Sequence, residues 1–196
     1  MRKIKELFVS SYKEMKDLRC IVLAAMLGSL SVVLGFMTVM LWDFIKVGFT
    51  FLPNQLVYSL FGPFVGLIYG AAIDILTFIV KPMGSFFPGF TLSAMVTGVI
   101  YGLFLYQRPM SIKRIAAAKI VRVLLVDLLM NTYWLTLLNG SAFMVILPMR
   151  AIKQLIMLPI ETLMFFAVIK AIEASGILKI IYGEKARVKL KLKQTK

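Results

Sequence analysis

The sequence predicts an all-α integral membrane protein, a bundle of six transmembrane helices in which the second helix is short. Composition is the first observation: 60% of the 196 residues are hydrophobic and only 16% are charged, whereas a soluble domain carries about 25% charged residues. The mean hydropathy is +0.89. The second observation is that the apolar residues fall in long blocks, and about 20 helical residues cross a bilayer. One membrane domain fits this length.

Six apolar segments follow one another along the chain. The first is long enough for one span, and the residues after it, 45–51, alternate in a way that suits a loop or an extended segment. The second reaches only about half-way across a bilayer. Gly62 and Pro63 separate it from the third, because proline favours the first turn of a helix. Pro148 and Pro159 predict a loop-like start and a kink in the last segment. The predicted segments are 20–42, 52–61, 63–80, 91–106, 115–138 and 143–172.

Charge distribution predicts the orientation of these segments. The formal net charge is +14, and the basic residues crowd the two ends of the chain and the loop 107–114. Such residues are typical of cytoplasmic loops rather than of nucleic-acid binding here, so we expect both termini in the cytoplasm. The predicted division is a cytoplasmic amphipathic arm at 1–19, a six-helix membrane domain at 20–182 and a basic cytoplasmic tail at 183–196.

Residue types that support catalysis are scarce. The sequence has no histidine and one cysteine, Cys20, and it has no glycine-rich loop ending in Gly-Lys-Ser/Thr. It therefore offers neither the commonest general base nor a nucleotide-binding loop. We expect no enzyme activity, no metal and no cofactor, and any ATP hydrolysis would have to take place on another chain.

Polar residues lie within the fifth segment, where they are costly and usually functional. Asp127, Asn131 and Trp134 are spaced i, i+4 and i+7, so an α-helix places them on one face. Asp74 on the third segment reaches a similar depth. Two carboxylates and an amide suit a planar, nitrogen-rich ligand, because a carboxylate accepts two parallel N–H bonds. The alternative is that either aspartate forms only a salt bridge between helices.

Arg122 lies about 140° around an α-helix from Asp127, so it need not share that face. It either contacts the ligand or pairs with Glu161 on the last segment. On the opposite side of the membrane from the termini, a cationic rim is expected, with aromatic residues in the same loops. Either the rim forms a vestibule for an anionic solute, or its side chains extend to the membrane interface. The cations are Lys46, Lys81, Arg150 and Lys153.

Small residues mark one face of the first segment. Ala24, Gly28 and Ser31 are spaced so that another helix can approach closely in lipid. The partner of this face is either a helix of the same domain or another membrane subunit, and the spacing alone does not separate the two.

Several stretches make the chain resemble the S components of energy-coupling factor (ECF) vitamin transporters, over residues 15–182. The general resemblance lies in the six-segment layout and in L-F-G-P-F-V-G-L-I-Y-G-A-A-I-D at 60–74. Three further stretches look like the folate-specific branch of that family. They are F-F-P-G-F-T-L-S-A-M-V-T-G-V-I-Y-G-L-F-L-Y (86–106), N-T-Y-W-L (131–135) and R-A-I-K-Q-L-I-M-L-P-I-E (150–161).

This resemblance implies a high-affinity substrate-binding subunit in the bacterial plasma membrane that captures folate, or a reduced folate, from outside. Its implied partners are a transmembrane coupling subunit of the EcfT type and two cytoplasmic ATPases of the EcfA type. The face at Ala24, Gly28 and Ser31 would dock on the coupling subunit. The loops 42–53 and 81–88 would act as external gates.

Folate also suits the polar residues, since its pterin offers an amino-amidine edge and its glutamate is dianionic. The residues expected to bind the pterin by hydrogen bonds are Asp127, Asn131 and Asp74. The residues expected to stack on its ring are Phe87, Tyr133 and Trp134. The residues expected to meet the glutamate or line its approach are Arg150, Lys153 and Lys46. Within the family riboflavin is the nearest rival, because it is flat but neutral, whereas thiamine is cationic and biotin has no extended aromatic ring. A membrane scaffold without a ligand is the alternative from another class.

Overall fold

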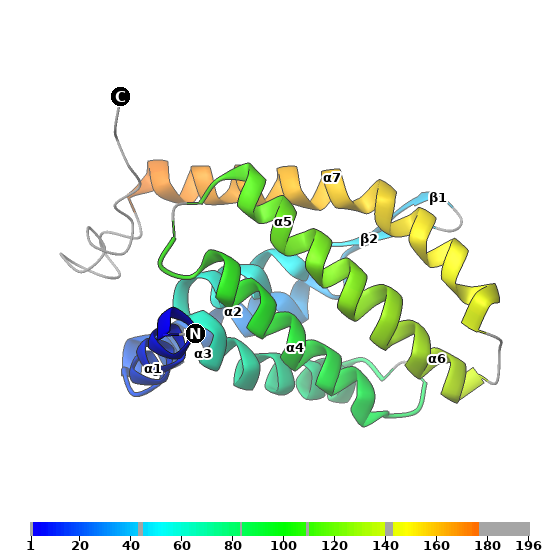
Figure 1. The fold of residues 1–196 in the computed structure, drawn as a ribbon, viewed down its shortest axis with the longest axis horizontal. Helices are drawn as coiled ribbons and strands as arrows, with labels where there is room; N and C mark the ends of the chain where they lie inside the picture. The colour runs from blue at the N-terminus through cyan, green and yellow to red at the C-terminus, as the bar shows by residue number, and fades with distance from the viewer. Residues whose placement is uncertain (1, 43–44, 83, 109, 140–142, 177–196) are drawn as a thin grey trace.

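The computed structural model describes residues 2–42, 45–82, 84–108, 110–139 and 143–176. They form an almost entirely helical protein with one short β-hairpin (Figure 1). The hairpin is made by β1 (Thr38–Trp42) and β2 (Ile45–Gly48), which pair antiparallel. The helices are α1 (Arg2–Met15), α2 (Leu18–Leu34), α3 (Phe51–Val80), α4 (Pro88–Leu105), α5 (Ile112–Arg122), the π-helix η1 (Val123–Met130), α6 (Asn131–Asn139) and α7 (Phe143–Ser175).

Several of these helices are long and apolar enough to cross a membrane. Three helical segments meet the length and hydropathy needed for a membrane span on their own, namely Phe51–Val80, Pro88–Leu105 and Leu147–Ser175. Helices α1 and α2 meet it only when they are taken together, and they are bent by 87° relative to each other. The elements α5, η1 and α6 follow one another without a gap and form one rod across the molecule (Figure 1). The predicted all-α membrane fold is confirmed, while the side on which each terminus lies stays a prediction.

A break at Gly62 divides α3 and produces the short second segment. Gly62 has φ 89° and ψ −172°, a backbone conformation that is essentially restricted to glycine. Pro63 follows and has no N–H to donate. Residues 51–61 therefore form a short helix and 63–80 a longer one, as the Gly-Pro pair predicted.

Ser11 of α1 bonds to the backbone on both sides of this break. Its hydroxyl donates to the carbonyl of Phe61 at 2.6 Å and accepts from the amides of Phe64 at 3.0 Å and Val65 at 3.1 Å. These are groups that a helix end leaves unpaired. A side chain from another helix thus caps both new ends of α3.

The 63–80 part of α3 packs closely against α4. A Cβ on Gly98 would lie 2.0 Å from the carbonyl oxygen of Gly66, and one on Gly66 would lie 2.7 Å from that of Gly98. Neither position has room for a side chain, so the two backbones touch, as small residues allow in membrane bundles.

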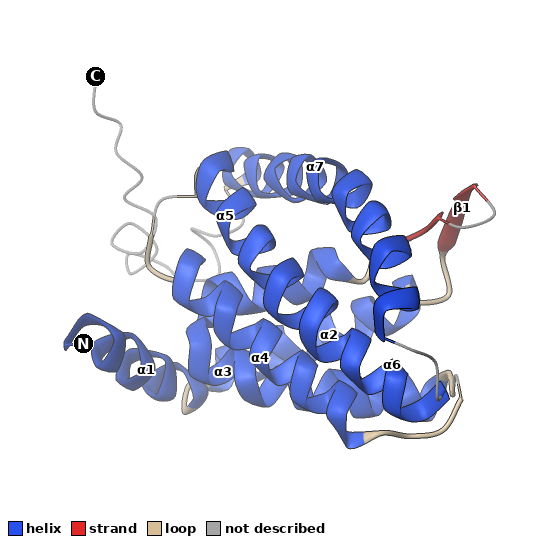
Figure 2. Cartoon of the chain, turned by 45° about the vertical axis from the view of Figure 1, so that its right-hand side comes forward, coloured by secondary structure: helices blue, strands red, loops and turns tan. Residues whose placement is uncertain are grey.

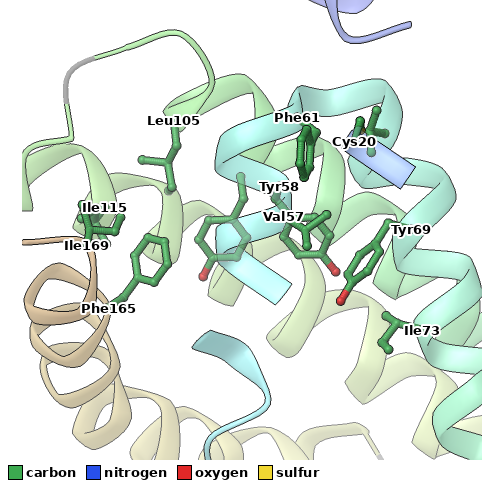
Figure 3. Packing of buried hydrophobic residues seen from close by; sticks show 13 residues of the cluster. Cys20, Val57, Tyr58, Phe61, Tyr69, Ile73, Leu105, Ile115, Phe165 and Ile169 are labelled. Carbon is green, nitrogen blue, oxygen red and sulfur yellow. The ribbon is translucent and has the colours of Figure 1, made fainter. Parts of the chain in front are cut away.

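The buried apolar core joins both parts of α3 to α4, α5 and α7 (Figure 3). Tyr58 and Tyr69 face each other edge-on, with ring centroids 5.7 Å apart, on opposite sides of the break. Phe61, Leu105 and Phe165 belong to this core and are at most 1% exposed. This core fixes the angle between the two parts of α3.

Two predicted boundaries were wrong. The first segment was predicted to run from 20 to 42, but α2 ends at Leu34 and residues 38–42 form β1. Thr38, Val39 and Trp42 are residue types that favour strands, and β2 gives them a partner. The last segment was predicted to start as a loop, but α7 is helical from Phe143 through both prolines. The extended segment predicted within 45–51 corresponds to β2.

The molecule has two distinct ends. The hairpin lies beside the first part of α7, at the end of the molecule where α6 also ends, whereas α1 lies at the other end, beside the start of the 63–80 part of α3 (Figure 2). The predicted basic tail, 183–196, lies outside the described residues.

Candidate functional site

A polar cavity of about 270 Å³ lies where α2, α3, α4 and the rod 112–139 meet. Both parts of α3 contribute to it, so the break at Gly62 shapes its wall. Polar side chains dominate the lining, with Tyr58 and Phe90 as its aromatic members. The polar residues that line it are Ser31, Thr50, Asn54, Asp74, Thr77, Ser93, Thr97, Arg122 and Asn131.

The π-helix η1 decides which groups of the rod face this cavity. In a π-helix the hydrogen bonds join residues five apart, so Arg122 and Asp127 lie over each other rather than about 140° apart as in an α-helix. Arg122 Nη1 and Asp127 Oδ2 are 2.9 Å apart. The prediction that Arg122 falls off the face of Asp127 was therefore wrong, because it assumed α-helical geometry.

Asp127 lies behind Arg122 rather than in the cavity wall. Its side chain is 4% exposed, it is absent from the cavity lining, and its backbone carbonyl accepts from the Thr132 hydroxyl at 3.1 Å. Asn131 Nδ2 approaches its Oδ1 at 3.5 Å. The aspartate thus balances the charge of Arg122 and orients the groups that do reach the cavity.

Glu161 pairs with a residue that the sequence prediction did not consider. Lys119 is 1% exposed and forms an ion pair and hydrogen bond with Glu161 across α5 and α7. The predicted alternative of an Arg122–Glu161 pair is thus replaced by two pairs, Lys119–Glu161 and Arg122–Asp127. In both pairs a charge that is removed from water has an opposite charge beside it, which limits the cost of burying it.

Polar atoms in the cavity region retain bonding capacity. Asp74 accepts from the Thr91 hydroxyl at 2.8 Å, and a carboxylate can accept several further bonds. Among the described residues, the buried atoms without a hydrogen-bond partner include Asn131 Oδ1, Arg122 Nε, Arg150 Nε and Asp127 Oδ2, whose contact with Arg122 is an ion pair. Unsatisfied buried polar groups are uncommon in folded proteins. The cavity region thus offers both hydrogen-bond acceptors and cationic hydrogen-bond donors to a ligand.

An aromatic cluster adjoins the cavity. Phe87 lies 5.5 Å from Trp134 and 6.0 Å from Phe90, centroid to centroid. The Trp134 indole donates to the Ser93 hydroxyl at 3.1 Å, which fixes its ring. Tyr133 packs against Trp134 at 5.2 Å but is 51% exposed. Of the three aromatic residues predicted to stack on a ligand, Phe87 and Trp134 lie together in a packed cluster.

The predicted cationic rim is divided among different surroundings. Arg150 is partly buried and close enough to Asp127 and Arg122 for their charges to act on it. Lys153 is exposed on α7. Lys81 donates to the carbonyl of Gly35 at 3.1 Å and thereby joins the end of α3 to the end of α2. Lys46 lies in β2, and its side chain is outside the described part of the structure.

The small residues of α2 face two different surfaces. Ala24 and Gly28 line an apolar groove of about 670 Å³ between α2 and the 63–80 part of α3, together with Ala25 and Ser29. Ser31 instead lines the polar cavity and donates to the carbonyl of Thr50 at 3.3 Å. The predicted face thus combines a groove with a cavity wall.

Several cavity residues were not anticipated from the sequence. Asn54, Tyr58 and Thr97 look like ordinary helix residues until the bundle brings their segments together. The sequence feature that could have indicated them is the polar pair Asn54-Gln55 within the short, otherwise apolar segment 51–61. No cluster of three acidic or cysteine side chains that could hold a metal occurs among the described residues.

Comparison with known proteins agrees with the earlier resemblance. The family model described as "ECF transporter, substrate-specific component" matches residues 19–182. A folate transporter FolT of Clostridium novyi (strain NT) is 41% identical over 129 residues, which are 66% of this chain and 75% of that protein. A folate transporter FolT of Leuconostoc mesenteroides subsp. mesenteroides is 32% identical over 151 residues, covering 74% and 81%.

A solved structure is similar in fold as well as in sequence. A crystal structure of FolT bound with folic acid aligns with a TM-score of 0.69 at 31% identity and covers 78% of this chain and 93% of that one. The family is a transport component rather than an enzyme. The chain belongs to the substrate-specific components of ECF transporters and is a multi-pass protein of the cell membrane.

Proposed function

We propose that this chain binds folate or a reduced folate with high affinity and supplies it to an ECF transporter that imports it. The observation that carries this proposal is the polar cavity, in which Asp74, Arg122 and Asn131 meet beside an aromatic cluster. A pterin needs acceptors for its amino-amidine edge and an aromatic surface for its ring. The similarity to two FolT proteins and to FolT bound with folic acid supports the same ligand.

Within this cavity, Asp74 and Asn131 are the groups we assign to the pterin. Asp74 is the carboxylate that lines the cavity, and Asn131 offers an unpaired Oδ1. Phe87 and Trp134 would stack on the ring, with Tyr133 at the exposed margin. The volume of about 270 Å³ is near the lower limit of small-molecule sites, which suits a bicyclic ring better than a whole folate. The glutamate then lies outside the cavity.

The glutamate is assigned to the cations beside the cavity. Arg150 is the best placed, because its Nε is buried without a partner and it lies near Arg122. Lys153 and Lys46 would line the approach. In this arrangement the hairpin and the loop after α3 are on the extracellular side, and α1 is on the cytoplasmic side.

Titration calorimetry of the purified chain tests the ligand. We expect tight binding of folate and 5-formyltetrahydrofolate and weak or absent binding of riboflavin and thiamine. Losing one hydrogen bond to a charged group costs about 1.5–3 kcal/mol, so Asp74→Asn is expected to weaken folate by about 10- to 100-fold. Glu173→Gln, an acidic residue outside the cavity lining, is the matched control. Tight riboflavin binding with weak folate binding would reject the proposal, and no binding at all would favour a scaffold.

A second titration separates the two parts of the ligand. Arg150→Ala is expected to weaken folate but to leave pteroate, which lacks the glutamate, nearly unchanged. The reason is that only folate presents two tail carboxylates to the guanidinium. Lys170→Ala, on the same helix, is the control. Equal losses for folate and pteroate would show that Arg150 does not meet the glutamate.

We propose further that the coupling subunit and the two ATPases are separate chains, and that the apolar groove receives a helix of the coupling subunit. Ala25 and Ser29 are exposed within the groove, and Ala24 and Gly28 form its floor. Small side chains at this spacing allow a second helix to approach closely in lipid.

A further inference from the structure

Helix α1 contributes nothing to the lining of the polar cavity, yet it is firmly held. Its axis and that of α2 differ by 87°. Since α2 packs in the bundle, α1 lies across the end of the bundle. A helix in that position has one face on the protein and another on the interface between lipid and water.

The inner face of α1 is fixed by specific contacts. Besides the three bonds of Ser11 at the break in α3, the Ser10 hydroxyl lies 3.1 Å from the Tyr106 hydroxyl and accepts from Gln107 Nε2 at 2.8 Å. The Tyr12 ring meets Phe64 edge-on at 5.3 Å. These contacts set the rotation of α1 about its axis, and they therefore determine which residues face outward.

The outer face carries cations between apolar side chains. Lys5, Val9, Lys13 and Lys16 are spaced i, i+4, i+8 and i+11, so they share one side of the helix, and all four are exposed. Val9 is 55% exposed, and the Tyr12 ring, 43% exposed, lies under Lys16 Nζ at 5.1 Å. A row of lysines with apolar side chains between them matches the boundary between phospholipid headgroups and acyl chains.

Charge around α1 favours an anionic surface. Between Arg2 and Arg19 the chain has six Lys or Arg residues and three Asp or Glu residues. One acidic residue, Asp17, accepts from the Arg19 amide as the N-cap of α2. The exposed Arg108 follows Gln107 in the turn after α4, next to Ser10. Basic residues from two separate segments thus lie at this end of the bundle.

We propose that α1 is an interfacial helix whose Lys5, Lys13 and Lys16 bind the headgroups of anionic phospholipids, with Val9 and Tyr12 inserted beside them. The site is independent of folate. Its partner is the lipid surface, because the face continues the membrane bundle and combines apolar with cationic side chains.

The test uses the full chain in nanodiscs, with a fluorophore on a Val9→Cys variant in a Cys20→Ala background. Quenching by spin-labelled phosphatidylglycerol is compared with quenching by spin-labelled phosphatidylcholine at the same mole fraction. We expect phosphatidylglycerol to quench several-fold more strongly, and high salt to remove the difference, because salt screens surface charges. Lys13→Gln with Lys16→Gln is expected to abolish this several-fold preference, because one lysine near an anionic surface accounts for about fivefold in lipid binding.

The matched control is Lys113→Gln with Lys170→Gln, which removes the same charge from exposed positions outside α1. It should keep the preference for phosphatidylglycerol. Equal quenching by the two lipids, or an unchanged preference in the Lys13 and Lys16 variant, would overturn the proposal. A third result would also overturn the proposal: free quenching by aqueous iodide that disappears when the coupling subunit and ATPases are added. That result would show that the outer face of α1 is a protein interface rather than a lipid-binding face.

Discussion

Arg122 shows how one partly buried cation can organise a membrane site. It lines the cavity, its Nη1 is held by Asp127, and its Nε has no partner among the described residues. A charge in a membrane helix is costly and is usually paired or functional, and this arginine has a partner on one side and unused capacity on the other. In the proposed site, Asp127 would therefore position Arg122 rather than contact the pterin directly.

The ion pair of Arg122 can be measured by a double-mutant cycle. Removing one member of a buried pair costs about 3–5 kcal/mol, so we expect Arg122→Gln and Asp127→Asn each to lower thermal stability strongly. The double variant should lose much less than the sum of the two. The cycle of Arg122→Gln with Glu161→Gln should show a smaller coupling, because Glu161 pairs with Lys119. A larger coupling to Glu161 would contradict the assigned pairs.

Two helices depart from α-helical geometry, and each departure shapes the cavity. The break at Gly62 turns the direction of α3, so that Asn54 and Tyr58 from one part and Asp74 and Thr77 from the other line one space. The π-helix η1 brings Arg122 over Asp127. Such π-helical segments are frequent at functional sites.

Ser11 is the side chain expected to hold the break. Ser11→Ala would remove the acceptor of the Phe64 and Val65 amides and the hydroxyl that donates to the Phe61 carbonyl. Leaving buried groups unpaired costs about 1–3 kcal/mol, so we expect a lower midpoint of thermal unfolding and faster hydrogen exchange at Phe64 and Val65. Ser10→Ala is the matched control and should have a smaller effect. Equal effects of the two variants would show that the cap at the break contributes little.

At the scale of the whole molecule, the polar cavity and the apolar groove are separate surfaces built partly from the same helices. The polar cavity and the apolar groove both use α2 and the 63–80 part of α3, and Ile73 lines both. A ligand in the cavity and a partner in the groove would therefore contact the same pair of helices. Because the other lining residues of the two surfaces differ, a substitution in the groove can alter coupling without altering the cavity.

Ala25→Trp is expected to separate these activities. The larger side chain would fill the groove and keep out a partner helix, while the cavity remains intact. We expect unchanged folate affinity in calorimetry but loss of uptake in vesicles that contain the coupling subunit and ATPases. Met26→Trp is the control, because Met26 is 64% exposed on the same helix but does not line the groove. Loss of folate binding in Ala25→Trp would reject this separation.

The sequence by itself determined the membrane class, the six-segment layout and the short second segment. Long apolar blocks and a Gly-Pro pair are local signals, and they act in nearly the same way in any fold. The resemblance to S components was confirmed because it rested on such contiguous stretches, including residues 60–74 and 86–106. Asp74, Asn131 and Arg122 were also recognisable as candidate site residues, since polar side chains in apolar helices are conspicuous.

Only the tertiary structure decided which polar groups meet. An α-helical wheel separated Arg122 from Asp127, and the π-helix reversed that result. Lys119 became the partner of Glu161 because α5 packs on α7, and Ser31 joined the cavity because α2 packs on α3. The end of the first segment was likewise set by β2, which gave residues 38–42 a strand to pair with. Pairing depends on which helices become neighbours and on their rotation, and neither quantity is encoded in the local pattern of any one segment.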